Sequence, residues 1–280
     1  AKFETYEAEA GNPFRDGTDH MFTGGLDAKI GITNDMTLDL TINPDFGQVE
    51  ADPSAIALDG FQIFFQEQRP FFVENKNIFD YRVSRSEAGN TFGSDNVFYS
   101  RRIGRSPQGY PNLEDGEFVD QPENTAILGA AKFSGKTKKG WSIGVLESLT
   151  ANKYAVIDSN GEQRKELVEP LTNYFVGRIQ KDFNDRNTFI GGIFTATNRN
   201  NLTEELDFLH EAAYTGGFDF KHNWNERDWY IGGNLLFSHV KGSANAIQNT
   251  QESITHLFQR TGADYLSVDP NRTSLTGTGG

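Results

Sequence analysis

The chain has 280 residues, of which 39 are acidic and 26 are basic, so its formal charge at neutral pH is −13. This acidic balance argues against a nucleic-acid-binding protein, because the phosphate backbone requires a basic face. The absence of cysteine excludes disulfides, thiolate nucleophiles and cysteine-ligated metal centres within the chain. The sequence contains no run of about 18 apolar residues, the length that would predict a transmembrane helix. A transmembrane β-strand needs only about 9–11 residues, however, and alternate ones face lipid.

The start of the chain divides into an arm and a β-domain. Residues 1–21 are polar and rich in turn signals, and we expect a linker or an arm. Residues 22–280 are expected to form one β-domain that opens with a hairpin over residues 22–42. There, apolar and polar residues alternate on both sides of Thr33-Asn34-Asp35, as in two paired strands. Because the chain begins without methionine and ends in a glycine-rich stretch, we expect a longer natural polypeptide.

Residues 43–125 interrupt this alternation and mix aromatic with charged side chains. Ionisable side chains are rarely buried without a partner, so we expect the segment to lie inside a larger structure with its charges paired or hydrated. Proline at position 53 suits a helix start, and we expect a short helix over residues 55–65, a strand over 96–103 and a loop over 104–124. The aromatic residues expected to fill the interior are Phe61, Phe64, Phe65, Phe71, Phe72 and Phe79.

Hairpins return in residues 126–280. These strands are longer than the typical 5–6 residues, short turns contrast with long polar connections (151–169, 199–213 and 242–262), and aromatic residues stand near strand ends. The pattern favours an all-β fold, an antiparallel transmembrane β-barrel with an irregular, partly helical insert (43–125) in its lumen. The strands of this chain alone need not complete the barrel. A soluble β-sandwich or up-and-down barrel is the alternative. The predicted strand pairs are 126–134 with 141–150, 171–183 with 188–198, and 214–224 with 229–241.

Short motifs in the insert carry a resemblance to a known family. They are Asn43-Pro44-Asp45-Phe46, Gln48-Val49-Glu50-Ala51-Asp52-Pro53, Arg69-Pro70-Phe71-Phe72 and the run from Tyr99 to Arg105. In these residues the chain resembles domain-of-unknown-function family 5916, an outer-membrane β-barrel family common in Bacteroidota. Its members often carry an N-terminal domain similar to family-nine carbohydrate-binding modules. The resemblance implies a location in the Gram-negative outer membrane and no established reaction.

Charged residues of the insert are the first candidates for a site. A water-filled lumen tolerates charges that lipid does not, so we expect a charge network that locks the insert in place. The alternative is a plug or lumen-lining segment that closes the pore. The residues of this network are Glu67, Arg69, Glu74, Arg101, Arg102 and Arg105.

A second candidate is a calcium site. Asp45, Glu50 and Asp52 could ligate Ca²⁺, which prefers oxygen ligands, but their spacing matches no EF-hand loop, and helix-cap or turn roles explain them more simply. We expect no other cofactor. No HExxH motif occurs, and the sequence nominates no catalytic residue.

Three hypotheses for function follow. The leading one is a non-enzymatic outer-membrane β-barrel protein, engaged in envelope transport or acting as a subunit of a larger assembly. Its expected partners are outer-membrane lipid and other outer-membrane proteins or lipoproteins, and not nucleic acid. The second is a surface glycan-binding or glycan-processing protein, which rests on the family's association with carbohydrate-binding-like domains. The third is a soluble secreted β-domain.

Overall fold

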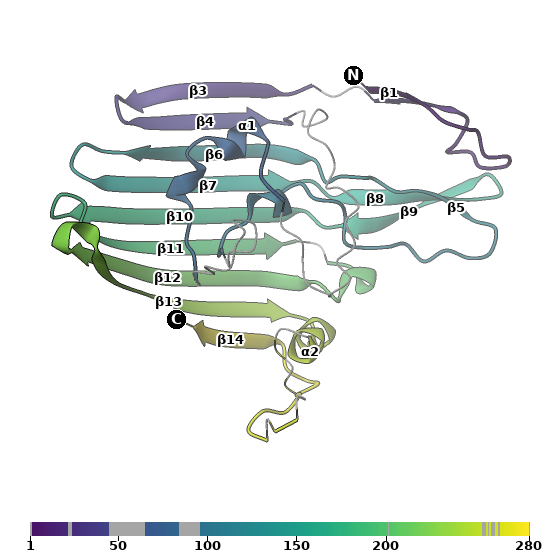
Figure 1. Cartoon of the computed structure of the whole chain (residues 1–280). Helices are drawn as coiled ribbons and strands as arrows, with labels where there is room; N and C mark the ends of the chain where they lie inside the picture. The colour runs from purple at the N-terminus through teal and green to yellow at the C-terminus, as the bar shows by residue number, and fades with distance from the viewer. Residues whose placement is uncertain are drawn as a thin grey trace.

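The computed structural model describes residues 2–21, 24–44, 65–83, 96–200, 202–253, 256, 258, 261–262 and 264–279. Antiparallel strands dominate these residues, which confirms the all-β class. Nine strands form one large sheet, which is open within the described residues (Figure 1). In spatial order they are β14 (Ser274–Gly279), β13 (Trp229–Gly242), β12 (His210–Trp224), β11 (Thr188–Arg199), β10 (Thr172–Phe183), β7 (Trp141–Thr150), β6 (Ile127–Lys136), β4 (Met36–Ile42) and β3 (Leu26–Thr33).

Each hairpin predicted from alternation is present. The pairs β3–β4, β6–β7, β10–β11 and β12–β13 are antiparallel, and their short turns lie together at the left end of the sheet in Figure 1. Asn184 and Asn225 begin two of these turns with φ of 49° each. Asparagine enters this left-handed region more readily than most residues, so the sequence chemistry of the turns matches their backbone.

The other end of the sheet carries structure that the sequence did not predict. The expected polar connection 151–169 forms a hairpin, β8 (Lys153–Ser159) with β9 (Glu162–Glu169), which β5 (Phe118–Asp120) joins. Figure 1 shows this small sheet extending past the strand ends. The expected arm contains a hairpin, β1 (Lys2–Thr5) with β2 (Thr18–Met21). Helix α2 (Ala244–Glu252) follows β13.

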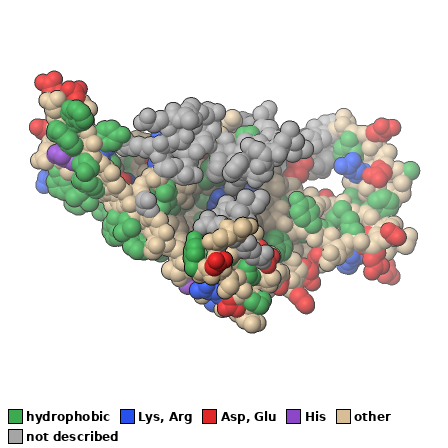
Figure 2. Space-filling view, turned by 60° about the horizontal axis from the view of Figure 1, so that its bottom comes forward, with side chains coloured by type: hydrophobic (Ala, Val, Ile, Leu, Met, Phe, Trp, Pro, Cys, Tyr) green, Lys and Arg blue, Asp and Glu red, His purple; other side chains and the backbone are tan. Residues whose placement is uncertain are grey.

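The two faces of the large sheet have opposite polarity. Successive residues of a strand point to opposite faces, and the pairing register shows which residues share a face. One face, here called the apolar face, carries large hydrophobic residues that remain exposed. Such side chains gather at the left of Figure 2, the end that carries the short turns. The residues are Leu26, Ile30, Ile32, Ile42, Trp141, Val145, Ile179, Phe183, Ile190, Phe194, Phe218, Phe220, Trp224, Trp229, Ile231, Leu235 and Phe237.

The opposite face, the polar face, is rich in polar residues that are nevertheless buried. The described parts of the insert, residues 65–83 and 96–105, cover it; they include helix α1 (Pro70–Val73) and the 3₁₀ helices Lys76–Ile78 and Ser100–Arg102. Figure 1 shows α1 lying across the strands. The buried polar residues on this face include Asp39, Thr41, Lys132, Ser134, Ser142, Ser148, Thr150, Thr172 and Arg178.

A small apolar core holds the insert against this face. Phe72, Phe79, Tyr81 and Ile103 of the insert pack with Leu146, Val176 and Ile193 of the sheet. Of the predicted interior aromatics, Phe72 and Phe79 are buried, Phe71 packs against the same core, and Phe65 is half-buried. Phe61, Phe64 and nearly all of the predicted helix 55–65 lie outside the described residues.

The strand expected over residues 96–103 is wrong. Residues 100–102 form a 3₁₀ helix instead, and Asn96 makes one isolated bridge with Arg82. The reason is that the carbonyls of Ser100 and Ile103 accept hydrogen bonds from the Arg69 guanidinium. No described helix is long and apolar enough to cross a membrane.

Candidate functional site on the polar face

One part of the polar face is a cluster of Glu67, Arg69 and Ser100. Arg69 binds the Glu67 carboxylate with two donors, Nε to Oε1 at 2.8 Å and Nη2 to Oε2 at 2.7 Å. Ser100 Oγ donates to Oε2 at 2.6 Å. Arg69 also donates to the carbonyls of Ser100 and Ile103 at 2.8 and 2.6 Å. A bidentate, charge-assisted contact of this kind is among the strongest hydrogen-bonded pairs.

This cluster is almost completely buried. Glu67 is 4% exposed and Arg69 is 7% exposed. Burial raises the pKa of Glu67, but the hydrogen bonds and charge of Arg69, together with the Ser100 hydroxyl, outweigh it and hold the pKa below its ordinary value. Glu67 is therefore a carboxylate at neutral pH, and the pair ties residues 67–69 to residues 100–103.

Lys132 is the centre of a second cluster, which holds α1 over β3, β4 and β6. Its side chain is 1% exposed, and Nζ lies 3.4 Å from Asp39 Oδ2. Nζ also donates to the carbonyls of Phe71 and Glu74. The Glu74 carboxylate pairs with Lys29, which also lies 4.0 Å from Asp39. Because Asp39 of the sheet, Glu74 of the insert and two carbonyls of the insert lie around it, the buried lysine is compensated.

Arg178 and Asp219 form the third cluster and lie on strands that are not neighbours. Arg178 of β10 binds Asp219 of β12 through two contacts of 2.6 and 2.7 Å, across β11. Gly191 of β11 makes this possible, since a Cβ there would lie 2.5 Å from Arg178 Nη1 and 2.6 Å from Asp219 Oδ1. The Arg178 guanidinium stands 5.3 Å from the centre of the Tyr81 ring.

Tyr81 joins the insert to strands β12 and β13 of the sheet. Its hydroxyl donates to the carbonyls of Phe218 and Leu235, with distances of 2.7 and 3.2 Å. Gly217 faces it: a Cβ there would lie 2.8 Å from the hydroxyl oxygen. Glycine on the polar face thus provides the space into which the insert packs.

The six charged residues predicted as one network occupy several places. Glu67 and Arg69 bind each other, whereas Glu74 belongs to the Lys132 cluster. Arg101 donates to the carbonyl of Gln66 and stands 5.9 Å from the Phe65 ring. Arg102 lies near Arg105. Whether these contacts lock a lumen insert remains a prediction.

Arg105 lies apart from the carboxylates of the insert. It is close to Tyr174 and Arg199, and Glu169 is the acidic residue nearest this group in the described residues. Arg105 Nε is buried and has no hydrogen-bond partner among the residues described. This end of the polar face is therefore richer in positive charge than the rest.

Sequence reasoning missed the sheet's contribution to these clusters. Asp39, Lys132, Arg178 and Asp219 all face the insert, and each stands at a strand position between two apolar-face residues. That position was the available signal. A charged residue that alternates with apolar residues along a strand lies on the opposite face of the sheet.

The carboxylates of this face are paired. Each carboxylate of the three clusters is engaged by a cation. No group of three His, Asp or Glu side chains that could hold a metal ion occurs in the part of the chain that the structure describes. The proposed calcium ligands Asp45, Glu50 and Asp52 lie outside it. A cavity of about 270 Å³ separates the insert from β6 and β7, with Glu67, Phe98 and Lys132 in its wall.

Comparison with curated proteins found no match, and neither did comparison with solved structures. A family profile does match: it covers residues 2–269, nearly the whole chain, and its description is "Domain of unknown function (DUF5916)". This is the family that the motifs of the insert resemble. The chain belongs to the DUF5916 family.

Proposed function

We propose that this chain is a non-enzymatic β-barrel protein of the Gram-negative outer membrane, whose insert lies in the lumen and whose role is envelope transport. One observation carries the proposal: the large sheet exposes its apolar face and covers its polar face. A soluble sheet does the opposite, because its hydrophobic face packs on a core and its polar face meets water. A transmembrane barrel has an apolar exterior and a polar interior.

The apolar face is too extensive for a soluble surface. Phe218 is 65% exposed, Trp229 63% and Ile231 56%, and exposed large hydrophobic residues also occur on β3, β4, β7, β10 and β11. Soluble monomers rarely expose contiguous apolar patches beyond a few hundred Å². Within the described residues, the small sheet of β5, β8 and β9 extends past the strand ends and does not cover this face.

Strand length and aromatic placement agree with this interpretation. Strand β7 has 10 residues and rises about 33 Å. At a tilt of about 40° it would cross about 25 Å, the height of a barrel's lipid-facing band. Trp141, Phe183, Trp224 and Trp229 stand on the apolar face beside the short turns. Aromatic residues prefer this position at a membrane–water interface.

The polar face supports a lumen. Lys132 and Arg178 are almost completely buried on it, and such charges would be costly on a lipid-facing surface. The insert supplies their partners through Glu74, α1 and Tyr81. Transport then requires that part of the insert moves or leaves a path beside it.

The test uses two neighbouring residues that point to opposite faces. The chain has no cysteine, so Phe237→Cys on the apolar face and Ser238→Cys on the polar face each introduce a single labelling site. Each variant is refolded into phosphatidylcholine vesicles and labelled with an environment-sensitive fluorophore. We expect blue-shifted emission and quenching by a spin-labelled lipid at position 237 but not at position 238. Equal behaviour at the two positions, or a chain that stays in the aqueous phase, would overturn the proposal.

A further inference from the structure

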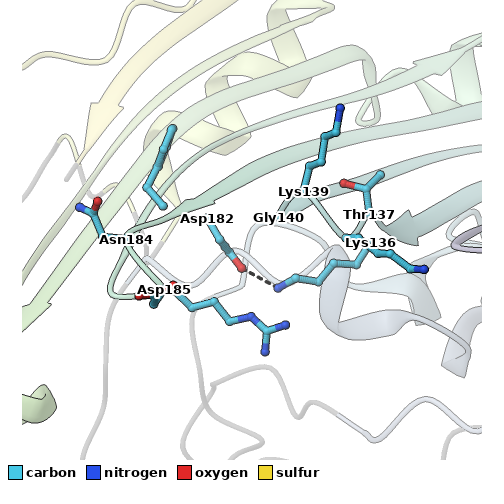
Figure 3. Close-up of a pocket in the computed structure, with 10 residues that line it drawn as sticks. Lys136, Thr137, Lys139, Gly140, Asp182, Asn184 and Asp185 are labelled. Atoms are coloured by element: carbon cyan, nitrogen blue, oxygen red, sulfur yellow. Dashed lines mark hydrogen bonds and ion pairs between the residues drawn. The ribbon is translucent and has the colours of Figure 1, made fainter.

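Two short turns enclose a basic cavity at one end of the sheet. The cavity measures about 460 Å³ and lies between the turns that join β6 to β7 and β10 to β11 (Figure 3). Among its ten lining residues, four are basic and two are acidic, although the whole chain has a charge of −13. The basic residues are Lys136, Lys138, Lys139 and Arg186, and the acidic ones are Asp182 and Asp185.

Part of this positive charge is uncompensated. Lys136 Nζ lies 2.7 Å from Asp182 Oδ2, so these two charges cancel. Lys138 and Lys139 are exposed and make no ion pair among the described residues. In Figure 3 the side chain of Lys139 points away from Asp182. Two ammonium groups therefore remain available to an external anion.

The cavity adjoins the aromatic end of the apolar face. Lys181 lies beside it, donates a hydrogen bond to the carbonyl of Lys139, and stands 5.2 Å from the Trp141 ring and 5.7 Å from the Phe183 ring. Trp141 and Phe183 are 40% and 42% exposed on the apolar face. Aromatic rings with cations just beyond them match the order of acyl chain and headgroup in a lipid leaflet.

We propose that this cavity binds the phosphate of an anionic lipid headgroup, with Lys138 and Lys139 as its main cationic contacts. The inference rests on the proposed membrane insertion, because the apolar face places the cavity at headgroup depth. Lysine ammonium groups bind phosphate as point charges, and clustered lysines beside a membrane surface attract anionic lipid. Trp141 and Phe183 would meanwhile contact the upper acyl chain.

The experiment measures lipid selectivity of the full chain in phosphatidylcholine vesicles. Electron spin resonance with spin-labelled phosphatidylglycerol and phosphatidylcholine gives the relative affinity of the protein boundary for the two lipids. We expect a preference for phosphatidylglycerol that falls by about fivefold for each lysine replaced in Lys138→Gln/Lys139→Gln. The matched control, Lys153→Gln/Lys165→Gln, removes the same charge from the small sheet at the other end and should keep the preference.

Three outcomes would overturn the inference. One is no phosphatidylglycerol preference in the unaltered chain, and another is an equal loss in both double variants. The third is displacement of the spin-labelled lipid by millimolar inorganic phosphate, which would identify a soluble phosphate as the ligand. Lipid quenching at Phe237→Cys, measured in the same variants, separates the two proposals. If that quenching persists while selectivity is absent, only the headgroup site fails.

Discussion

Replacement of Arg69 by methionine should release the insert from the polar face. Methionine keeps most of the length and apolar stem of arginine but removes all five N–H donors. The variant leaves the Glu67 carboxylate, 4% exposed, with Ser100 Oγ as its side-chain donor. It also removes the donors to the carbonyls of Ser100 and Ile103 and the guanidinium that stands 4.3 Å from the Phe72 ring.

The expected cost follows from the burial of this pair. Removal of one partner of a buried ion pair typically costs about 3–5 kcal/mol, because the remaining charge is left uncompensated. The loss should act first on the folding of the insert, because the contacts of Arg69 with Glu67, Ser100 and Ile103 all lie within it. It should reach docking through Phe72 and Ile103, which pack against the sheet. A loss of about 3 kcal/mol raises the population of the undocked state roughly a hundredfold.

A cysteine under the insert can measure that population. Ser134 is 0% exposed, and its hydroxyl accepts a hydrogen bond from Asn75 Nδ2 at 3.0 Å. Ser134→Cys is nearly isosteric, and its thiol reacts with an alkylating reagent only when residue 75 moves away. Arg69→Met in this background should therefore increase the labelling rate roughly a hundredfold, while Glu67→Gln in addition should recover part of the loss.

Lys76→Met provides the control. Lys76 lies on the same insert, is exposed, and makes no ion pair among the described residues. A surface change of this kind is usually worth less than about 0.5 kcal/mol, so the labelling rate should stay within about twofold. If Arg69→Met changes the rate no more than Lys76→Met does, the Glu67–Arg69 pair does not seat the insert.

Three more predictions concern the insert and the polar face that it covers. The pKa of Glu67 is held below its ordinary value of 4.5. The contribution of Glu67 to docking is therefore present above that pH and is lost as the pH falls through the lower pKa of the docked state. Hydrogen exchange of residues 96–105, corrected for intrinsic rate, should accelerate at low pH in the unaltered chain and not in Glu67→Gln. Gly144→Ala should weaken docking by about 1–3 kcal/mol through overpacking, because a Cβ there would lie 2.8 Å from Ile78 and Phe79. Thiol labelling at Ser134→Cys should accelerate in this variant. Gly31→Ala, with open space around its Cβ, should leave the labelling rate unchanged. Lys132→Met should cost about 3–5 kcal/mol, because Asp39, 7% exposed, then retains Lys29 at 4.0 Å as its one cation among the described residues. Guanidinium titration would measure this loss, and no recovery on adding Asp39→Asn would contradict the reasoning.

Strand alternation predicted the large sheet because it reports a local property. Each strand of β12 and β13 has one apolar and one polar face, and the turn residues between them fix which residues pair. The β8–β9 hairpin was not predicted because its sequence lacks this local alternation. The first residues of β9, Glu162 to Arg164, are exposed on both faces, so no period-two pattern marks them, although Asn160-Gly161 supplies a turn signal.

The pairings on the polar face could not be predicted because they join distant residues. Arg178 and Asp219 are 41 residues apart. Their contact depends on the absence of a side chain at Gly191, which lies on β11 between their two strands. Likewise, nothing local to residues 96–103 reveals that Arg69 will capture two of their carbonyls. Sequence reasoning identified Glu67 and Arg69 as a candidate pair, but which cations the sheet presents is a property of its assembled register.

The polarity of the sheet explains the unusual composition of the insert. An ordinary core meets an apolar sheet face and can be purely hydrophobic, but this insert covers a face that presents buried cations. The insert places an aromatic ring near each of two buried cations, Lys132 and Arg178. Lys132 Nζ lies 4.9 Å from the centre of the Phe71 ring, and the Arg178 guanidinium lies 5.3 Å from the centre of the Tyr81 ring. A ring face attracts a cation while its edges supply apolar contact area. Mixed aromatic and charged sequence is therefore what a segment needs in order to pack on a polar wall.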